Sequence, residues 1–353
     1  MIRLIRLSWG AMLLAVLLVA CSGPSAASPS PTATATVARA TATFAPTPST
    51  TPRPGVTPVA LPSFAQLSAP SDQVLWVLVA GTRLFRGTDR DHVGGAVAVG
   101  DSWYEVPLPT PIANPEIAFI GPTEGWLSIA GVAAARCQQQ SVSLFHTADA
   151  GASWQALSPT GIAAAQCKEA LAFSDAQHGF LSAWDPNSPP VIYRSADGGR
   201  TWSASRPLPD PPGFSTSAAG FTLRAGTVKA FGTALLVGAV GQTTSGQRRY
   251  VFASADGGAS WTYRADVPDG DSPLTFVTAS RWLQIGPPGG SKETTDGGVS
   301  WHAFTTDYTQ AAPIAPVVVF GDPQVGYATV RGAIQRTIDG GAHWTGIRTP
   351  GTF

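Results

Sequence analysis

The sequence predicts an all-β protein built from repeated units of four short strands. Three observations carry this prediction. Glycine (38 residues) and proline (31) are abundant in a chain of 353 residues, which favours short elements joined by tight turns. Charged residues make up only 12% of the chain, so long charged helices are not expected. An eight-residue pattern, Ser/Thr-x-Asp-x-Gly-x-x-Trp, also occurs five times.

The first segment, residues 1–20, is predicted to be a secretory signal peptide. Arg3 and Arg6 form a basic head, and the apolar run Met12–Ala20 is too short to span a bilayer comfortably. The run ends in LVAC, which resembles the bacterial lipobox and implies that Cys21 becomes the lipidated N-terminus. An ordinary signal peptide with a chance cysteine is the alternative. We expect a lipid-anchored protein on the extracytoplasmic side of the cell membrane.

The next segment, residues 21–62, is predicted to be a disordered tether. It consists almost entirely of Ser, Thr, Pro and Ala, with Phe44 as its aromatic residue. Its apolar area is too small to offset the entropy lost on ordering. An extended chain of this kind rises ~3.1 Å per residue and so reaches on the order of 100 Å. We expect it to lift a folded domain, residues 63–353, from the membrane; a spacer with no length requirement is the alternative.

The repeated pattern has a physical rationale as a turn. The aspartate carboxylate can accept hydrogen bonds from the N–H groups of its own turn, and glycine allows positive φ. The tryptophan then buries its ring between neighbouring sheets. A structural role for these aspartates is therefore favoured over a catalytic or metal-binding one. The copies are Thr147, Asp149, Gly151, Trp154; Ser195, Asp197, Gly199, Trp202; Ser254, Asp256, Gly258, Trp261; Thr294, Asp296, Gly298, Trp301; and Thr337, Asp339, Gly341, Trp344.

Strand-like runs surround each copy, so one unit is four strands with the pattern between the third and the fourth. A degenerate first unit has Trp76 in its second strand, and Trp103 stands in for the tryptophan of the pattern. Counting it gives six units. A seventh is the alternative, if the 59-residue step from Asp197 to Asp256 hides one. Four-stranded units repeated around an axis form a β-propeller.

The pattern resembles the Asp-box, or bacterial neuraminidase repeat, of sialidases and other propellers. Across the whole unit, the sequence looks most like the photosystem II assembly and stability factor family. These resemblances imply architecture rather than activity. A sialidase would imply an arginine cluster, a Tyr/Glu nucleophile pair and an acid/base aspartate. The string Leu84-Phe85-Arg86-Gly87 lacks the Ile-Pro of that family's first arginine motif, so no catalytic residue is assigned.

Other chemistries find no support in the sequence. The five histidines are scattered without metal-ligand spacing, and neither a P-loop nor a Gly-x-Ser-x-Gly elbow occurs. The net charge of zero argues against a nucleic-acid surface. We therefore predict no cofactor, no metal and no nucleic-acid partner.

Two sets of repeated side chains have competing interpretations. Arg86, Arg194 and Arg336 share the position just before the pattern; we favour side chains that cover their own sheets over a basic ring for an acidic partner. Aromatic residues at the head of the second strand are interpreted as packing between blades rather than as sugar platforms. They are Trp76, Trp126, Trp282 and Tyr327.

The second-to-third strand loops and the links between blades are expected to open on one face. Cys137 and Cys167 lie in one such loop and one such link, so we predict that they form a disulfide. The longest loops are expected at 132–141, 185–190 and 241–249, and exposed loops on a rigid scaffold are the usual interaction sites. The candidate binding residues are Gln138, Gln139, Gln140, Asp185, Asn187, Gln242 and Arg248.

These features predict a monomeric, membrane-anchored propeller that acts as a non-enzymatic binding or assembly scaffold for an unknown protein or glycan. The alternative is an exo-glycosidase or carbohydrate-binding propeller of the sialidase type. Three arginines converging on the central axis would favour the alternative.

Overall fold

The computed structural model describes residues 65–88, 103–109, 114–134, 137, 139–186, 188–286, 289–308, 317–330 and 332–347. The expected signal peptide, the tether and the lipidation site Cys21 lie outside these residues, as do Gln138 and Asn187.

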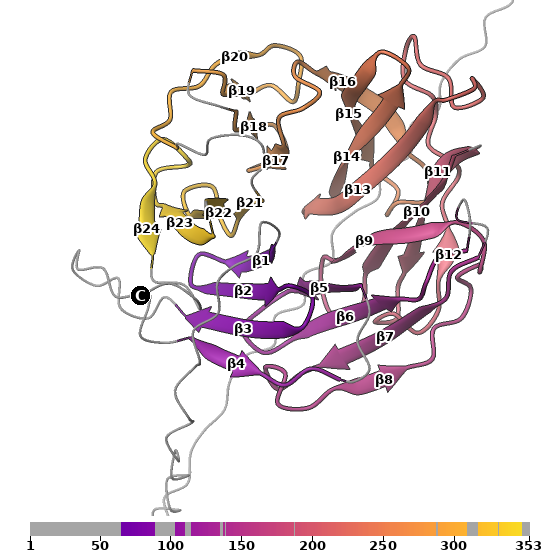
Figure 1. The fold of residues 1–353 in the computed structure, drawn as a ribbon, viewed down its shortest axis with the longest axis vertical. Helices are drawn as coiled ribbons and strands as arrows, with labels where there is room; N and C mark the ends of the chain where they lie inside the picture. Colours follow the sequence, from indigo (N-terminus) through magenta and orange to yellow (C-terminus); the bar gives the residue numbers. More distant parts are fainter. Residues whose placement is uncertain are drawn as a thin grey trace, which may run out of the picture. The chain divides into compact units, whose positions relative to one another are not determined.

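The described residues form six antiparallel sheets, each of four strands consecutive in the chain, which are the blades of a β-propeller (Figure 1). Blade 1 holds β1 (Ala65–Ser71), β2 (Val74–Val79), β3 (Arg83–Thr88) and β4 (Tyr104–Val106). Blade 2 holds β5 (Pro115–Phe119), β6 (Gly125–Ala130), β7 (Val142–Thr147) and β8 (Gln155–Leu157). Blade 3 holds β9 (Cys167–Phe173), β10 (Gly179–Asp185), β11 (Ser188–Ser195) and β12 (Ser203–Ala204).

The second half of the chain repeats the same order. Blade 4 holds β13 (Thr222–Phe231), β14 (Ala234–Thr243), β15 (Gly246–Ser254) and β16 (Thr262–Val267). Blade 5 holds β17 (Leu274–Phe276), β18 (Trp282–Gln284), β19 (Lys292–Thr294) and β20 (His302–Ala303). Blade 6 holds β21 (Val318–Phe320), β22 (Gly326–Val330), β23 (Ala333–Thr337) and β24 (Thr345–Ile347).

The first strand of each blade lies nearest the centre, and the ring closes where blade 6 meets blade 1 (Figure 1). Strand β1 contacts both β5 and β21. At the closure, the Tyr327 hydroxyl of blade 6 donates a hydrogen bond of 3.2 Å to the carbonyl of Asp72 in blade 1. Side chains also bridge inner strands elsewhere: the Gln66 amide of β1 donates to Pro115 O and accepts from the N–H of Ile117, both in β5.

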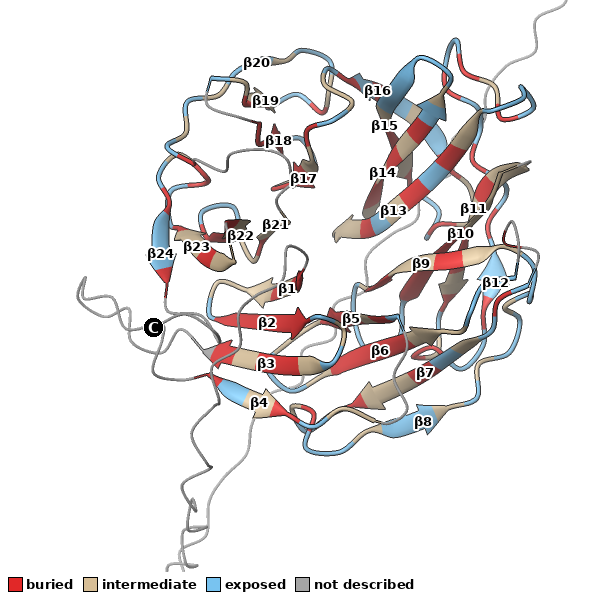
Figure 2. Ribbon diagram, in the orientation of Figure 1, coloured by how far each residue is buried: buried red, intermediate tan, exposed pale blue. Residues whose placement is uncertain are grey.

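Most of the core lies between neighbouring blades, and the outer strands β8, β12 and β20 are largely exposed (Figure 2). The Asp-box tryptophans take part in these interfaces: Trp202 packs among residues of blades 2 and 3, and Trp261 among residues of blades 3 and 4. Trp103 is 8% exposed and packs between blades 6 and 1, where the degenerate first unit was expected to place it.

The 59-residue step between Asp197 and Asp256 contains no extra blade. It is filled by the ten-residue strands β13 and β14 and by a long link, residues 205–221, between blades 3 and 4. Leu208 and Phe214 of this link are buried in the cluster between blades 3 and 4, so the link packs into that interface. The domain is therefore six-bladed, and the seven-bladed alternative is wrong.

The aromatic residues of the second strands are buried, with Trp76, Trp126 and Trp282 each 0% exposed. The Trp76 ring stacks on Phe119 of the next blade at a centroid distance of 3.6 Å, so it packs between blades. Trp282, however, does not share the position of Trp126. In the strand register, Trp282 lies opposite Thr294, the first residue of its Asp-box. Trp126 lies opposite His146, the residue just before its Asp-box.

Because side chains alternate across a strand, this shift of one residue turns the Trp282 ring to the opposite side of its sheet. The ring packs with Leu236, Val251 and Ala265 of the preceding blade. The grouping of Trp282 with the other three aromatics was therefore wrong, although its packing role was not.

Candidate functional site

The Asp-box carboxylates are engaged by their own turns. In blade 2, Asp149 Oδ1 accepts from the N–H of Ser153 at 2.9 Å and from the Thr147 hydroxyl at 2.9 Å, and Oδ2 accepts from the Ser153 hydroxyl at 2.6 Å. The Thr147 hydroxyl oxygen in turn accepts from the N–H of Gly151, whose φ is +76°. The two contacts to Oδ1 recur in the other four boxes. A hydroxyl also contacts Oδ2 in blades 3, 4 and 5, whereas His343 Nδ1 takes that place in blade 6. This geometry supports a structural role.

Hydrogen bonds from the side chain and N–H of Ser153 and from Thr147 lower the pKa of Asp149 from 3.8 to about 2. Because the native pKa lies below the unfolded value, the unfolded chain takes up the proton first as the pH falls. The contribution of Asp149 to stability is thus complete above the unfolded pKa and is lost as the pH falls from 3.8 towards about 2.

We expect Asp149→Asn to reduce the acid sensitivity of the domain, since this side chain no longer titrates. Denaturant midpoints of the variant and the wild type, measured at about pH 5, 3.5 and 2.5, should converge as the pH falls. A difference in midpoint that stays constant over this interval would contradict the lowered pKa.

The three repeated arginines lie apart, each on the third strand of its own blade. In the strand register, Arg86 lies opposite Trp76 of β2 and Tyr104 of β4. Its Nη1 donates a hydrogen bond to Pro122 O at 3.1 Å. Arg194 and Arg336 occupy the same register position in blades 3 and 6. The Arg86 guanidinium lies over the Trp76 and Tyr104 rings, so for this arginine the geometry supports a side chain that covers its own sheet.

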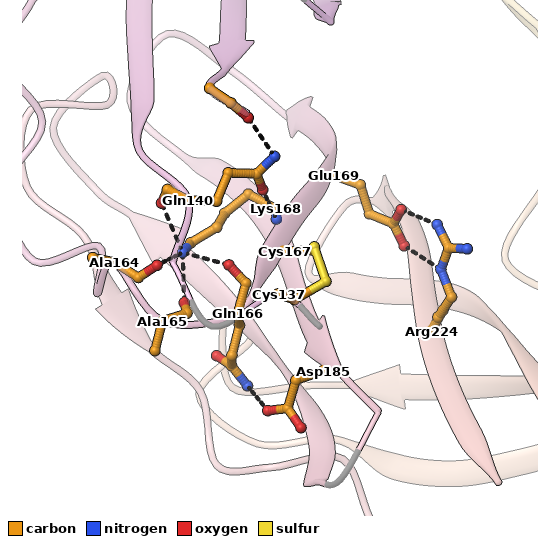
Figure 3. The surroundings of a disulfide bond; sticks show 11 residues. Cys137, Gln140, Ala164, Ala165, Gln166, Cys167, Lys168, Glu169, Asp185 and Arg224 are labelled. Atoms are coloured by element: carbon orange, nitrogen blue, oxygen red, sulfur yellow. Dashed lines mark hydrogen bonds and ion pairs between the residues drawn. A yellow bond between two sulfur atoms is a disulfide. The ribbon is translucent and has the colours of Figure 1, made fainter. Parts of the chain in front are cut away.

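A disulfide joins Cys137 and Cys167 on the face where the β6–β7 loop lies beside the link between blades 2 and 3 (Figure 3). Their Cα atoms are 4.8 Å apart. Cys137 lies in the β6–β7 loop, and Cys167 is the first residue of β9. Backbone hydrogen bonds from Gln166 N to Cys137 O and from Gln140 N to Ala164 O also tie the two segments together.

Lys168 reinforces this junction from inside (Figure 3). It is 5% exposed, and its ammonium donates to the carbonyls of Gln140, Ala164, Ala165 and Gln166 at 3.2, 3.1, 2.5 and 2.8 Å. Burial lowers the pKa of Lys168 to about 8. Sequence reasoning missed this role; the signal available was a rare lysine directly after a cysteine.

Gln140 is not the exposed binding residue that the sequence suggested. It is 7% exposed, donates from its amide to Gly131 O at 2.8 Å and accepts from the N–H of Lys168 at 2.7 Å. These bonds satisfy the backbone at the base of the loop, which is why a polar side chain is buried there.

Two of the three expected long loops are largely strand. Residues 185–190 form a tight turn and the start of β11, and residues 241–249 continue β14 and β15 around a turn at 244–245. Polar residues can continue a strand where one side of the hairpin faces solvent. Both segments therefore extend the neighbouring strands instead of forming long loops. Among the candidate residues, Gln139, Gln242 and Arg248 are exposed, while Asp185 is half-buried and accepts from the Ser188 hydroxyl at 2.6 Å.

The inner strands of the six blades surround a channel of about 1450 Å³. This exceeds the roughly 300–1,000 Å³ typical of pockets for drug-sized ligands. Two arginines are among its described lining residues, and both have protein partners. Arg224 pairs with Glu169 and lies over the Trp184 ring, and Arg249 donates to Gly270 O at 2.8 Å. The three converging arginines of a sialidase-type site are not assembled by these residues.

Among the described residues, no group of three or more His, Cys, Asp or Glu side chains is placed to hold a metal ion. No helix in the described part of the chain has the length and apolar character needed to cross a bilayer.

The comparisons with known proteins were made on the whole chain. No protein-family model matches it. One curated relative is the photosystem II assembly lipoprotein Ycf48 of Synechococcus sp. (strain CC9902), 31% identical over 104 residues. The match covers 28% of this chain and 31% of the relative, so the chain spans about a third of the curated relative it matches.

The solved structures that match include two YCF48 structures and a sialidase. YCF48 from Cyanidioschyzon merolae is 16% identical, with a TM-score of 0.49, over 82% of this chain and 86% of that one. YCF48 bound to a D1 peptide is 15% identical, with a TM-score of 0.43, over 79% and 95%. The Hadza microbial sialidase Hz136 is 14% identical, with a TM-score of 0.48, over 65% and 57%.

The six sheets and the Asp-box geometry establish the fold: the chain is an Asp-box six-bladed β-propeller, and 104 of its residues resemble part of Ycf48 in sequence.

Proposed function

We propose that this protein is a lipid-anchored extracytoplasmic scaffold that binds a partner protein through its disulfide face and catalyses no reaction on it. The disulfide face comprises the described residues of the β6–β7 loop (131–134, 137 and 139–141), the link 158–166 and the β10–β11 turn at Asp185.

The observation that carries the proposal is that the β6–β7 loop combines anchored and exposed residues. It is held by the Cys137–Cys167 disulfide, by Gln140 and by the Lys168 ammonium. Within the same loop, Val132 is 89% exposed, and Gln139 is exposed as well. Exposed residues next to such anchors lose little conformational entropy when a partner binds, so this arrangement suits recognition.

The chemistry of the channel supports binding over hydrolysis. Its described carboxylates are occupied: Glu116 accepts from the N–H groups of Ala170 and Leu171, and Glu169 pairs with Arg224. Burial raises the pKa of Glu116, and the two N–H donors oppose that effect. A matched relative is named as an assembly lipoprotein, which also fits a scaffold.

Affinity capture from membranes with the full chain tests the proposal. We compare the wild type with Val132→Asp in the β6–β7 loop and with Ile338→Asp, a matched change at a residue 66% exposed in the blade 6 box turn. The same partner should be recovered with the wild type and Ile338→Asp and lost with Val132→Asp. Retention by Val132→Asp, or turnover in a glycosidase panel on the purified protein, would contradict the proposed function.

Lipidation has its own test. Cys21→Ser should leave the chain without its anchor, because the thiol that accepts the lipid is gone. Detergent-phase partitioning of mutant and wild type measures this directly. Membrane retention that is the same for both would show that Cys21 is not the anchor.

A further inference from the structure

One equivalent row of residues crosses each blade from the channel outward. Its outer member is the residue just before the Asp-box, and strand pairing identifies the inner members. In blade 2, for example, Ala118 pairs with Trp126, which pairs with His146. The six inner residues all line the channel: Ser68, Ala118, Ala172, Lys229, Thr275 and Val319.

Lys229 is the exception in this ring, because the other five residues are small or uncharged. The outer end of the same row shows the reverse pattern. Blade 4 has Ala253 there, where each of the other five blades has a charged residue or a histidine. In blade 4 the charge of the row therefore lies inside the channel instead of on the outer sheet.

The Lys229 ammonium has little in the channel to stabilise its charge. The ammonium donates a long hydrogen bond, 3.4 Å, to Phe320 O of blade 6. Burial lowers the pKa of Lys229, and no carboxylate among the described residues contributes to that shift.

The other charged groups that face the channel are already engaged. Glu116 binds two N–H groups, and Glu169 pairs with Arg224. Asp322 accepts from the N–H groups of Gln324 and Val325, and Arg249 donates to Gly270 O. Lys229 is half-buried, and its ammonium has no carboxylate partner among the described residues that line the channel.

We propose that the channel binds a small oxyanion, either a carboxylate or inorganic phosphate, through the Lys229 ammonium. A charge-assisted hydrogen bond from Lys229 to the anion would give this ammonium a counter-charge within the channel. The site lies in the channel and is independent of partner binding at the disulfide face.

Thermal unfolding of the full chain, titrated separately with sodium phosphate and sodium acetate at constant ionic strength, tests the site. Wild-type Tm should rise in a saturable manner with at least one of the two probes, and the probe that acts identifies the class of anion. Lys229→Met should abolish the rise, whereas Lys292→Met, which removes a lysine outside the channel lining, should retain it. No saturable rise in the wild type, or an equal rise in Lys229→Met, overturns the proposal.

A second measurement needs no variant. The sequence contains three lysines, Lys168, Lys229 and Lys292, so amine acetylation can be mapped by mass spectrometry residue by residue. The anion that raises Tm should slow the acetylation of Lys229 with the same half-saturation concentration and leave the rate at Lys292 unchanged. Equal protection of both lysines, or of neither, overturns the proposal.

Discussion

Trp202→Ala and Trp261→Ala are each expected to lower the free energy of unfolding by roughly 3–5 kcal/mol, the usual range for deleting a buried aromatic side chain. The two rings are 5% and 4% exposed and lie between neighbouring blades. The Trp202 ring contacts Phe173 edge to face at 6.1 Å, and its indole N–H donates to Gly199 O at 2.8 Å. Removing it therefore opens a cavity and leaves a carbonyl acceptor in the turn without its donor.

Denaturant midpoints measure this effect, and the Asp-box itself provides the control. Trp154 occupies the same box position in blade 2 but is only half-buried. Trp154→Ala should consequently cost less than either of the other two changes. Equal midpoints for all three variants would show that the box position, rather than burial between blades, determines the stability of this repeat.

Removing the disulfide is the second change with a large expected effect. The bridge spans 30 residues, and the chain-entropy model gives roughly 3–4 kcal/mol for a loop of that length. Most of this effect acts on the unfolded chain, since Lys168 and Gln140 still hold the loop in the folded state. We expect the Cys137→Ser, Cys167→Ser double variant to unfold at lower denaturant but to keep the native fold.

The wild type with and without reductant provides the matched comparison. Reductant should shift the wild-type midpoint to that of the double variant and leave the variant unchanged. Intact mass after alkylation of the denatured, unreduced protein gives an independent check. Two alkyl adducts on Cys137 and Cys167 would contradict the disulfide.

The repeat made most of the fold predictable. Five boxes with four fixed residues each located the turn between the third and fourth strands, and Trp103 located the first blade without an intact box. The blade count stayed open in the sequence because the 59-residue step could hold another unit. The structure shows that the extra residues lengthen β13 and β14 and form a link that packs between blades 3 and 4.

The site was less predictable because its residues act through contacts distant in sequence. Gln140 resembled its exposed neighbour Gln139 in the sequence, yet Gln140 turns inward to bind Gly131 and Lys168. Trp282 could not be aligned correctly, since one residue of register decides which side of a strand a side chain faces. The unusual position of Lys229 becomes visible only when all six inner strands are placed in register.

The claim that the disulfide face binds the partner is tested most directly by site-specific photo-crosslinking in native membranes. One chain carries the photoreactive residue at Gln139, exposed on the disulfide face, and a matched chain carries it at Val299, 79% exposed in the blade 5 box turn. A discrete crosslinked partner from position 139 and none from position 299 is the result that we predict. Crosslinking from position 299 alone, or equally from both positions, would contradict the assignment of the disulfide face.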